Sequence, residues 1–139
     1  MSAEGKKLAV GVFCVDWRLH HKDVNIVEKV RAHLDVDGVD VIGVPGPDGV
    51  CLQDGRQMEV APLTGWLKLL IGAHKPVVLA FIGHYQCAGN PVDDATHDKN
   101  VEESVARFKK ETGFAGPVVA LSATYTSDKE WGLKEVARV

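Results

Sequence analysis

Residues 76–83, with the sequence PVVLAFIG, form the most apolar stretch of this 139-residue chain and decide its fold. A continuous apolar run without polar alternation is typical of a strand buried on both faces of a sheet, so we expect a central strand here. Residues 8–13 (LAVGVF) have the same character. Residues 39–44 (VDVIGV) and 118–121 predict two further strands, the former followed by a cluster of turn residues.

Helices are expected between these strands, because apolar residues recur there at helical spacing. The first expected helix spans residues 22–34. The expected boundary residues are Asp23 at the start of the first helix, Pro62 and Gly72 near the start and end of the second, and Asn100 with Glu103 at the start of the third. Residues 50–59 show no period and predict an irregular connection.

The alternation of strands and helices predicts an α/β fold in three layers, with a mostly parallel central β-sheet and helices on both faces. Residues 131–139 alternate only weakly, so they fit either an antiparallel edge strand or a short helix. The length suits a single domain over residues 1–139. In such a sheet, ligands bind beyond the carboxyl ends of the strands.

Composition and charge exclude several classes of function. The chain has 16 Lys and Arg against 19 Asp and Glu, a net charge of −3, whereas a nucleic-acid-binding domain usually carries a basic patch. No apolar run approaches the roughly 18 residues of a membrane-spanning helix. The apolar stretch near the N-terminus is too short for a signal peptide and has no small-residue cleavage site. We therefore expect a cytoplasmic protein that binds neither nucleic acid nor membrane.

Metal-ligating residues follow two of the predicted strands. Cys14 comes directly after residues 8–13, and His84 and Cys87 follow the central strand. If these strands are neighbours, their carboxyl ends bring together two thiolates and one imidazole, a tetrahedral zinc set with one position left open. An open position is typical of catalytic zinc, which lowers the pKa of bound water to about 7. Three cysteines without an export signal also favour metal ligands or a reactive thiol over disulfides, and Cys51 is expected to be a free thiol.

Asp16 and Arg18 lie close to the first of these ligands in the sequence. Arg18 can hold the Asp16 carboxylate through a bidentate ion pair and keep it ionised. The carboxylate would then accept the hydrogen of a zinc-bound hydroxide and leave a lone pair of that hydroxide free to attack. If the pair opens, Asp16 is near enough to become a fourth metal ligand.

The pattern C-x-D-x-R at residues 14–18, followed by G-H-x-x-C at residues 83–87, resembles the signature of the β-class carbonic anhydrases. Each half follows a predicted strand, and together they form a specific pattern. The similarity extends over roughly residues 8–136, with residues 100–110 similar to a helix of that family and residues 117–136 similar to its closing strands.

This resemblance implies zinc-dependent reversible hydration of carbon dioxide to bicarbonate. By the resemblance, Cys14, His84 and Cys87 hold the zinc ion, and Asp16 and Arg18 form the dyad that orients the hydroxide. The backbone N–H groups of Ala88 and Gly89 would help to hold the substrate oxygen. The family also implies a homodimer or a larger even-numbered homo-oligomer.

The chain departs from the family pattern around the expected pocket. Trp17 stands where the family generally has Ser, Ala88 where it has Gly, and Tyr85 where it has a small hydroxyl residue. These departures leave two alternatives open. One is a related zinc hydrolase that acts on carbon disulfide or carbonyl sulfide. The other is a zinc-bound but inactive interaction module.

The remaining polar residues have simpler interpretations. His20 and His21 are expected to be solvated loop residues, with a proton relay as the alternative. Asp93, Asp94 and Asp98 are expected to lie in a solvated loop, with a second cation site as the alternative that no ligand spacing supports. His97 is expected to have no functional role.

Overall fold

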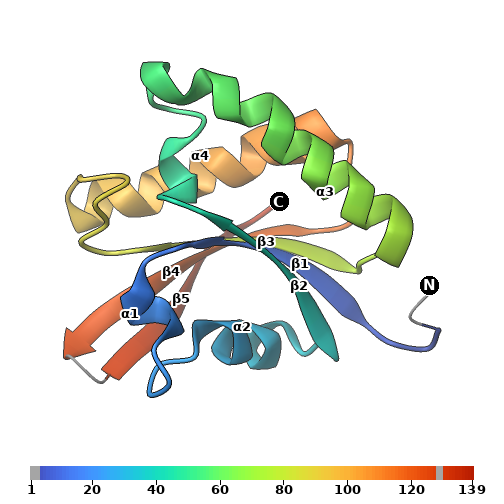
Figure 1. Ribbon diagram of the computed structural model, residues 1–139, viewed down its shortest axis with the longest axis horizontal. Coiled ribbons are helices and arrows are strands. Elements are labelled where there is room, and N and C mark those ends of the chain that lie inside the picture. The colour runs from blue at the N-terminus through green and yellow to red at the C-terminus, as the bar shows by residue number, and fades with distance from the viewer. Residues whose placement is uncertain (1–3, 128–129) are drawn as a thin grey trace.

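The computed structural model describes residues 4–127 and 130–139 and contains one five-stranded sheet (Figure 1). Its strands are β1 (Leu8–Cys14), β2 (Gly38–Val44), β3 (Val78–His84), β4 (Val118–Ser127) and β5 (Glu130–Arg138). They lie in the order β2-β1-β3-β4-β5, and all neighbouring pairs are parallel except β4 with β5. The predicted α/β fold with a mostly parallel sheet is therefore confirmed.

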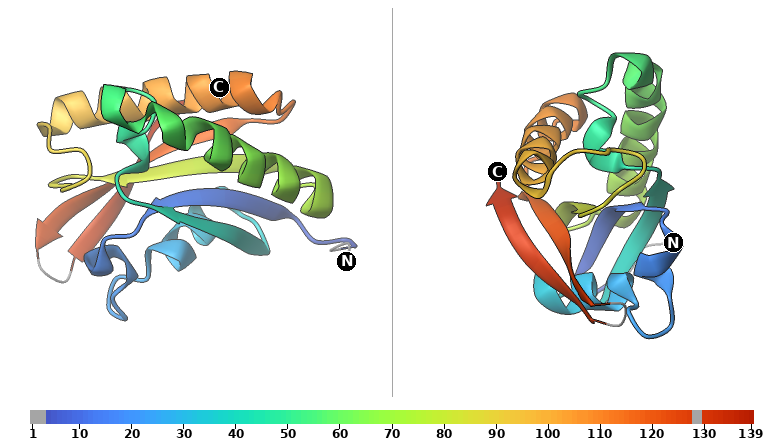
Figure 2. Two further views of the ribbon diagram at one scale, coloured as in Figure 1. Left: turned by 45° about the horizontal axis from the view of Figure 1, so that its top comes forward. Right: turned by 90° about the vertical axis from the view of Figure 1, so that its left-hand side faces the viewer.

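Helices cover both faces of this sheet, as expected. Figure 2 shows α3 (Val60–His74) and α4 (Asp94–Thr112) side by side on one face, while α1 (Trp17–His20) and α2 (Ile26–Leu34) lie on the other. The burial of every residue of β3 explains its continuous apolar sequence, because both of its faces pack against helices. On the α4 face, Phe81 stacks on Phe108 with ring centroids 4.9 Å apart.

Two predicted helix boundaries are wrong because of left-handed residues. Helix α2 begins at Ile26 rather than near Asp23, because a turn with left-handed Asn25 precedes it. Helix α3 continues through Gly72 and ends where Lys75 adopts a left-handed conformation, with φ of 48°. In both cases the boundary is set by a non-glycine residue in the left-handed region, which sequence patterns seldom indicate.

The start of α4 also differs from the prediction. The helix begins at Asp94, six residues before Asn100, and the Asp93 carboxylate caps it by accepting a hydrogen bond of 2.8 Å from the Thr96 N–H. An Asp at the N-cap satisfies one of the free N–H groups of the first turn. Asp93, Asp94 and Asp98 are therefore part of a helix terminus and its first turns, and the expected solvated acidic loop is wrong.

Two further segments are more regular than expected. Within residues 50–59 a 3₁₀ helix spans Asp54–Glu59, and the ion pair of Arg56 Nε with Glu59 Oε2 at 2.6 Å suits its three-residue period. The fourth strand extends beyond residue 121 to Ser127, because it pairs with the C-terminal strand. That C-terminal segment is an antiparallel edge strand, which decides between the two alternatives.

The sheet places the residues predicted as metal ligands at the carboxyl ends of two adjacent strands. β1 and β3 are parallel neighbours and end at Cys14 and His84, so their carboxyl ends lie side by side. In the part of the chain that the structure describes, no helix combines the length and the apolar character that crossing a membrane requires.

Candidate metal centre

Cys14, His84 and Cys87 are all buried and meet at the carboxyl ends of β1 and β3. Their ligand atoms all lie within 4.8 Å of one another. The two sulfur atoms are 3.7 Å apart, and Nε2 of His84 is 3.2 Å from Sγ of Cys14. The structure thus brings together the three residues that the sequence predicts as ligands.

The His84 ring is held in an orientation that suits a ligand. Its Nδ1 lies 2.8 Å from the carbonyl oxygen of Tyr85 and donates to it. A hydrogen bond from Nδ1 to a carbonyl leaves Nε2 free to bind a metal and is the usual support of a ligating histidine. Burial lowers the pKa of His84, but the hydrogen bonds to Cys14 and Tyr85 outweigh burial and leave the pKa above its ordinary value.

The two thiols share one proton. The hydrogen bond from Cys87 lowers the pKa of Cys14 to about 4 despite burial, with further help from His84 and the Gly46 N–H, which lies 3.4 Å from Sγ. The same hydrogen bond raises the pKa of Cys87. One thiolate is therefore present in the folded protein at neutral pH before any cation binds.

This donor set fits a zinc ion. Two thiolates that bind one tetrahedral zinc at about 2.3 Å lie roughly 3.8 Å apart, close to the 3.7 Å between these sulfurs. Two soft sulfurs and an imidazole are also the ligands that select zinc over magnesium or calcium. A fourth position of the tetrahedron is left for a water or a substrate.

Asp16 and Arg18 lie beside the three ligands. Arg18 Nη2 is 2.8 Å from Oδ2 of Asp16, and its Nε is 3.1 Å from Oδ1. The Asp16 carboxylate also accepts the backbone N–H of Arg18, which caps α1. The hydrogen bond from the guanidinium holds the pKa of Asp16 below its usual range, so the carboxylate is ionised. Its Oδ2 lies 3.7 Å from Nε2 of His84.

An open cleft of about 590 Å³ leads to this ion pair. It is lined by Trp17, Arg18, His21, Asp23, Gln86, Tyr125 and Trp131. The Trp17 side chain is 72% exposed, so it forms part of the cleft wall and does not enter the core. The Arg18 guanidinium lies 5.7 Å from the ring centroid of Trp131, which helps to fix its position.

The other predicted site residues have distinct surroundings. Ala88 is exposed. Gly89 packs against the backbone of Gly46, and the Gly89 N–H favours the Cys87 thiolate through a hydrogen bond.

His20 is exposed, and its Nε2 lies 2.9 Å from the carbonyl oxygen of Cys14, the first candidate ligand. Cys51 is half-buried and lies outside the ligand cluster, and burial raises the pKa of its thiol to about 11.

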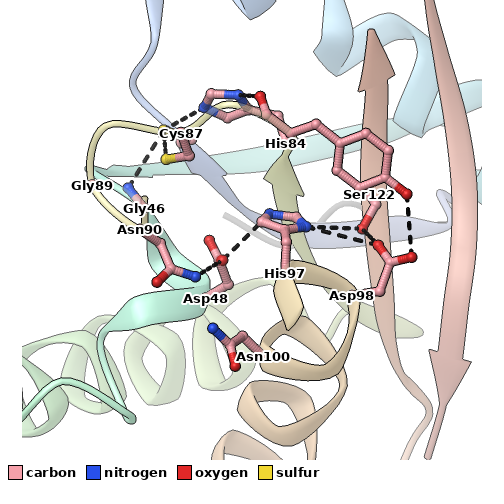
Figure 3. Close-up of polar contacts among 12 residues, drawn as sticks. Gly46, Asp48, His84, Cys87, Gly89, Asn90, His97, Asp98, Asn100 and Ser122 are labelled. Atoms are coloured by element: carbon pink, nitrogen blue, oxygen red, sulfur yellow. Dashed lines mark hydrogen bonds and ion pairs between the residues drawn. The ribbon is translucent and has the colours of Figure 1, made fainter. Parts of the chain in front are cut away.

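A buried polar cluster behind the ligands was missed by sequence reasoning. Asp48, Asn90 and His97 are each at most 3% exposed, and Asp48 lies between the other two and contacts both (Figure 3). Asp48 lies in the turn P-G-P-D-G, where an Asp is ordinary, and His97 lies 49 residues farther along the chain. The only sequence signal was a His on the apolar side of α4, where Val101, Val105 and Phe108 are also buried.

Comparison with protein families identifies the chain. A family model described as "Putative carbonic anhydrase" matches residues 4–137. The chain belongs to this family. The match spans the three candidate ligands and the Asp16–Arg18 pair, and it confirms the predicted resemblance. A comparison with curated proteins gave no match.

Proposed function

We propose that this carbonic anhydrase family member binds zinc through Cys14, His84 and Cys87 and catalyses the reversible hydration of carbon dioxide to bicarbonate. The observation that carries the proposal is the position of the Asp16 carboxylate, 3.7 Å from the candidate ligand atom of His84 and paired with Arg18. A structural zinc site needs four protein ligands, whereas this cluster has three and an acid–base group beside the open position.

Zinc, when bound, would lower the pKa of a coordinated water to about 7 and so supply a nucleophile at neutral pH. The role of Asp16 is to accept a hydrogen bond from the attacking water. Oδ1 of Asp16 already accepts the backbone N–H and the Nε of Arg18, whereas Oδ2 accepts Nη2 and a longer contact of 3.3 Å from the same Nε. Oδ2, the oxygen nearer His84, is therefore the one that can receive this hydrogen while the pair with Arg18 persists. The water is thereby oriented with a lone pair toward the substrate carbon.

Arg18 acts by holding Asp16. Besides its bonds to the carboxylate, its Nη2 donates to the carbonyl oxygen of Gln86 at 3.1 Å, which joins the β1 end to the loop after β3. This third contact fixes the guanidinium, and hence the carboxylate, relative to His84 and Cys87. Side chains fixed in this way keep the reacting groups aligned without reorganisation during the reaction.

The substrate is expected to approach through the cleft. Carbon dioxide is small and apolar, and the aromatic side chains of Trp17, Tyr125 and Trp131 supply apolar walls around Arg18. The exposed loop at Ala88 offers the backbone N–H that we propose as a donor to the substrate oxygen. Gly89 is a weaker candidate for this role, because its N–H is directed to the Cys87 sulfur.

We also propose that the active protein is a homodimer or a larger even-numbered assembly. β2 is an edge strand of the sheet, and Val41 on it is 51% exposed. On α3, which covers the opposite face of the sheet from Val41, Trp66 and Leu69 are 52% and 69% exposed. Apolar side chains exposed in this way favour burial against a second copy. Light scattering of the purified protein would measure the mass of the assembly.

The proposed function is tested by zinc analysis together with assays of three substrates. We expect one zinc per chain, hydration of carbon dioxide, and no sulfide release from carbonyl sulfide or carbon disulfide. Sulfide release without carbon dioxide hydration would replace the proposed substrate. Stoichiometric zinc without turnover of any of the three would indicate an inactive interaction module.

A further inference from the structure

Asp48 is a buried carboxylate directly behind the candidate metal centre, and its residue is 1% exposed. Its Oδ2 accepts a hydrogen bond from Nδ2 of Asn90 and forms an ion pair with Nε2 of His97 at 3.3 Å (Figure 3). Burial raises the pKa of Asp48, whereas the His97 charge and the Asn90 hydrogen bond oppose this shift. Burying such a pair is costly, and apolar residues of similar volume often give equal or greater stability.

His97 connects Asp48 to a second carboxylate. Its Nδ1 lies 3.5 Å from Oγ of Ser122 and 3.8 Å from Oδ1 of Asp98. The Ser122 hydroxyl donates to Asp98 at 2.8 Å, so its oxygen is free to accept from the ring. Both nitrogens of His97 therefore face oxygen atoms. At the surface, Asp98 is paired with Lys134 at 2.9 Å.

The contacts of Asp48 join two loops, each of which directs a backbone N–H toward a cysteine sulfur. Gly46, two residues before Asp48, donates its N–H to Sγ of Cys14 at 3.4 Å. Gly89, next to Asn90, supplies the hydrogen bond that favours the Cys87 thiolate. The loops touch at these two glycines, because a Cβ on Gly89 would come within 2.8 Å of the Gly46 nitrogen.

Arg56 holds the same two loops from the other side. Its Nη1 donates to the carbonyl oxygen of Gly46 at 3.0 Å and to that of Gly89 at 3.4 Å. Gly46 and Gly89 thus each direct an N–H toward a cysteine sulfur and a carbonyl oxygen toward Arg56. A small shift of the Gly46 turn would change its hydrogen bond to the Cys14 sulfur without moving the Cys14 backbone, which belongs to β1.

We propose that Asp48 is a positioning residue for the metal centre, whose carboxylate, held between Asn90 and His97, locks the Gly46 turn to the Gly89 loop so that each ligating sulfur accepts one backbone N–H. Hydrogen bonds to a ligating atom change its basicity and therefore its affinity for the metal. The inference rests on the proposed function only in taking the two cysteines as metal ligands.

The test uses cobalt(II) in place of zinc, because the thiolate-to-cobalt absorption band reports directly on the two sulfurs. In Asp48→Asn we expect this band to shift and the zinc affinity, measured by chelator competition, to fall by about 10–100-fold. Asp54→Asn is the matched control, since Asp54 is exposed on the neighbouring 3₁₀ helix. It should retain the wild-type band and affinity.

His97→Gln and the double variant Asp48→Asn with His97→Gln separate positioning from general destabilisation. Each single variant places an amide opposite one member of the original Asp48–His97 pair, whereas the double variant pairs two amides. We expect the double variant to recover part of the lost zinc affinity and to return the cobalt band toward its wild-type position. If Asp48→Asn does not fold, the His97→Gln band shift and its recovery in the double variant carry the same test.

The proposal is overturned if Asp48→Asn matches Asp54→Asn in both band position and zinc affinity, or if the double variant shows no recovery. The proposed function is contradicted by a different result, namely that the wild-type protein binds cobalt and zinc but does not hydrate carbon dioxide. The band comparison is still valid in that case, so the two failures are distinguishable.

Discussion

The Asp16 carboxylate is held at both oxygens by Arg18, with Nη2 2.8 Å from Oδ2 and Nε 3.1 Å from Oδ1. The same Oδ2 is 3.7 Å from Nε2 of His84, the nitrogen that faces the cysteine sulfurs. The carboxylate is therefore ionised and fixed next to the candidate metal position without being part of the three-residue ligand cluster. This arrangement separates metal binding from acid–base chemistry, so the two can be tested apart.

Asp16→Asn should retain zinc and lose carbon dioxide hydration by about 10²–10⁴-fold, the usual contribution of a positioned acid–base group. Asn has nearly the same shape, but its NH₂ end donates and cannot accept the hydrogen of the attacking water. Stopped-flow hydration and metal analysis of the same sample measure both quantities. Asp23→Asn, which changes another carboxylate at the cleft, should behave as wild type. A full rate in Asp16→Asn would remove the role proposed for this residue.

Cys14→Ser should abolish zinc binding, whereas Cys51→Ser should leave it unchanged. Cys14 is buried among the ligands and has a pKa of about 4, so it is a thiolate at neutral pH. Cys51 lies outside the cluster, and its pKa of about 11 keeps it protonated. Equilibrium dialysis against zinc gives the comparison. Zinc loss in Cys51→Ser equal to that in Cys14→Ser would contradict the assigned ligand set.

Gly89→Ala should lower the free energy of unfolding by about 1–3 kcal/mol and weaken zinc binding. The added Cβ would lie 2.8 Å from the Gly46 nitrogen and 2.9 Å from the Pro45 carbonyl carbon, and backbone cannot move aside cheaply. Gly55→Ala is the control, because its Cβ would meet nothing within 4 Å. Urea unfolding of both variants measures the difference, and equal stability would show that the two loops are not in contact.

Asp98→Asn should destabilise the protein by about 1–2 kcal/mol at pH 7 and by less at pH 3. Burial raises the pKa of Asp98, but hydrogen bonds from Lys134 and Ser122 outweigh it and leave the pKa below its ordinary value of about 3.9. A carboxyl with a lowered folded-state pKa contributes stability above its unfolded pKa, and the contribution disappears as pH falls through the folded value. Urea unfolding at both pH values checks this, and an identical difference at pH 7 and pH 3 would contradict it.

The strands and the ligand cluster could be predicted from the sequence because both depend on local patterns. Apolar runs such as residues 76–83 identify buried strands, and Cys14 and His84 stand at the ends of two of them. Once the strands are parallel neighbours, the ligands must meet. The Asp16–Arg18 pair follows in the same way, because its members are two residues apart.

The helix ends and the buried cluster could not be predicted because they depend on conformations and contacts without a local signature. Asn25 precedes a helix and Lys75 ends one, both in the left-handed region. Asn adopts this conformation more readily than Lys does, but neither residue type is specific for it. The partners Asp48 and His97 come from a turn and a helix far apart in the chain, and only the packing of α4 brings them within 3.3 Å. When the partner of a buried polar residue is this far away in the sequence, the sequence does not distinguish that residue from one exposed to solvent.

Stopped-flow hydration of carbon dioxide by the zinc-replete protein, from about pH 7 to pH 9, tests the central claim most directly. We predict a rate that rises with pH, because bound zinc would lower the pKa of a coordinated water to about 7 and so supply more of the nucleophile as pH increases. The rate should vanish in Cys87→Ser and persist in Cys51→Ser. A wild-type protein with one zinc per chain and no rate above buffer at any pH in this range would contradict the claim.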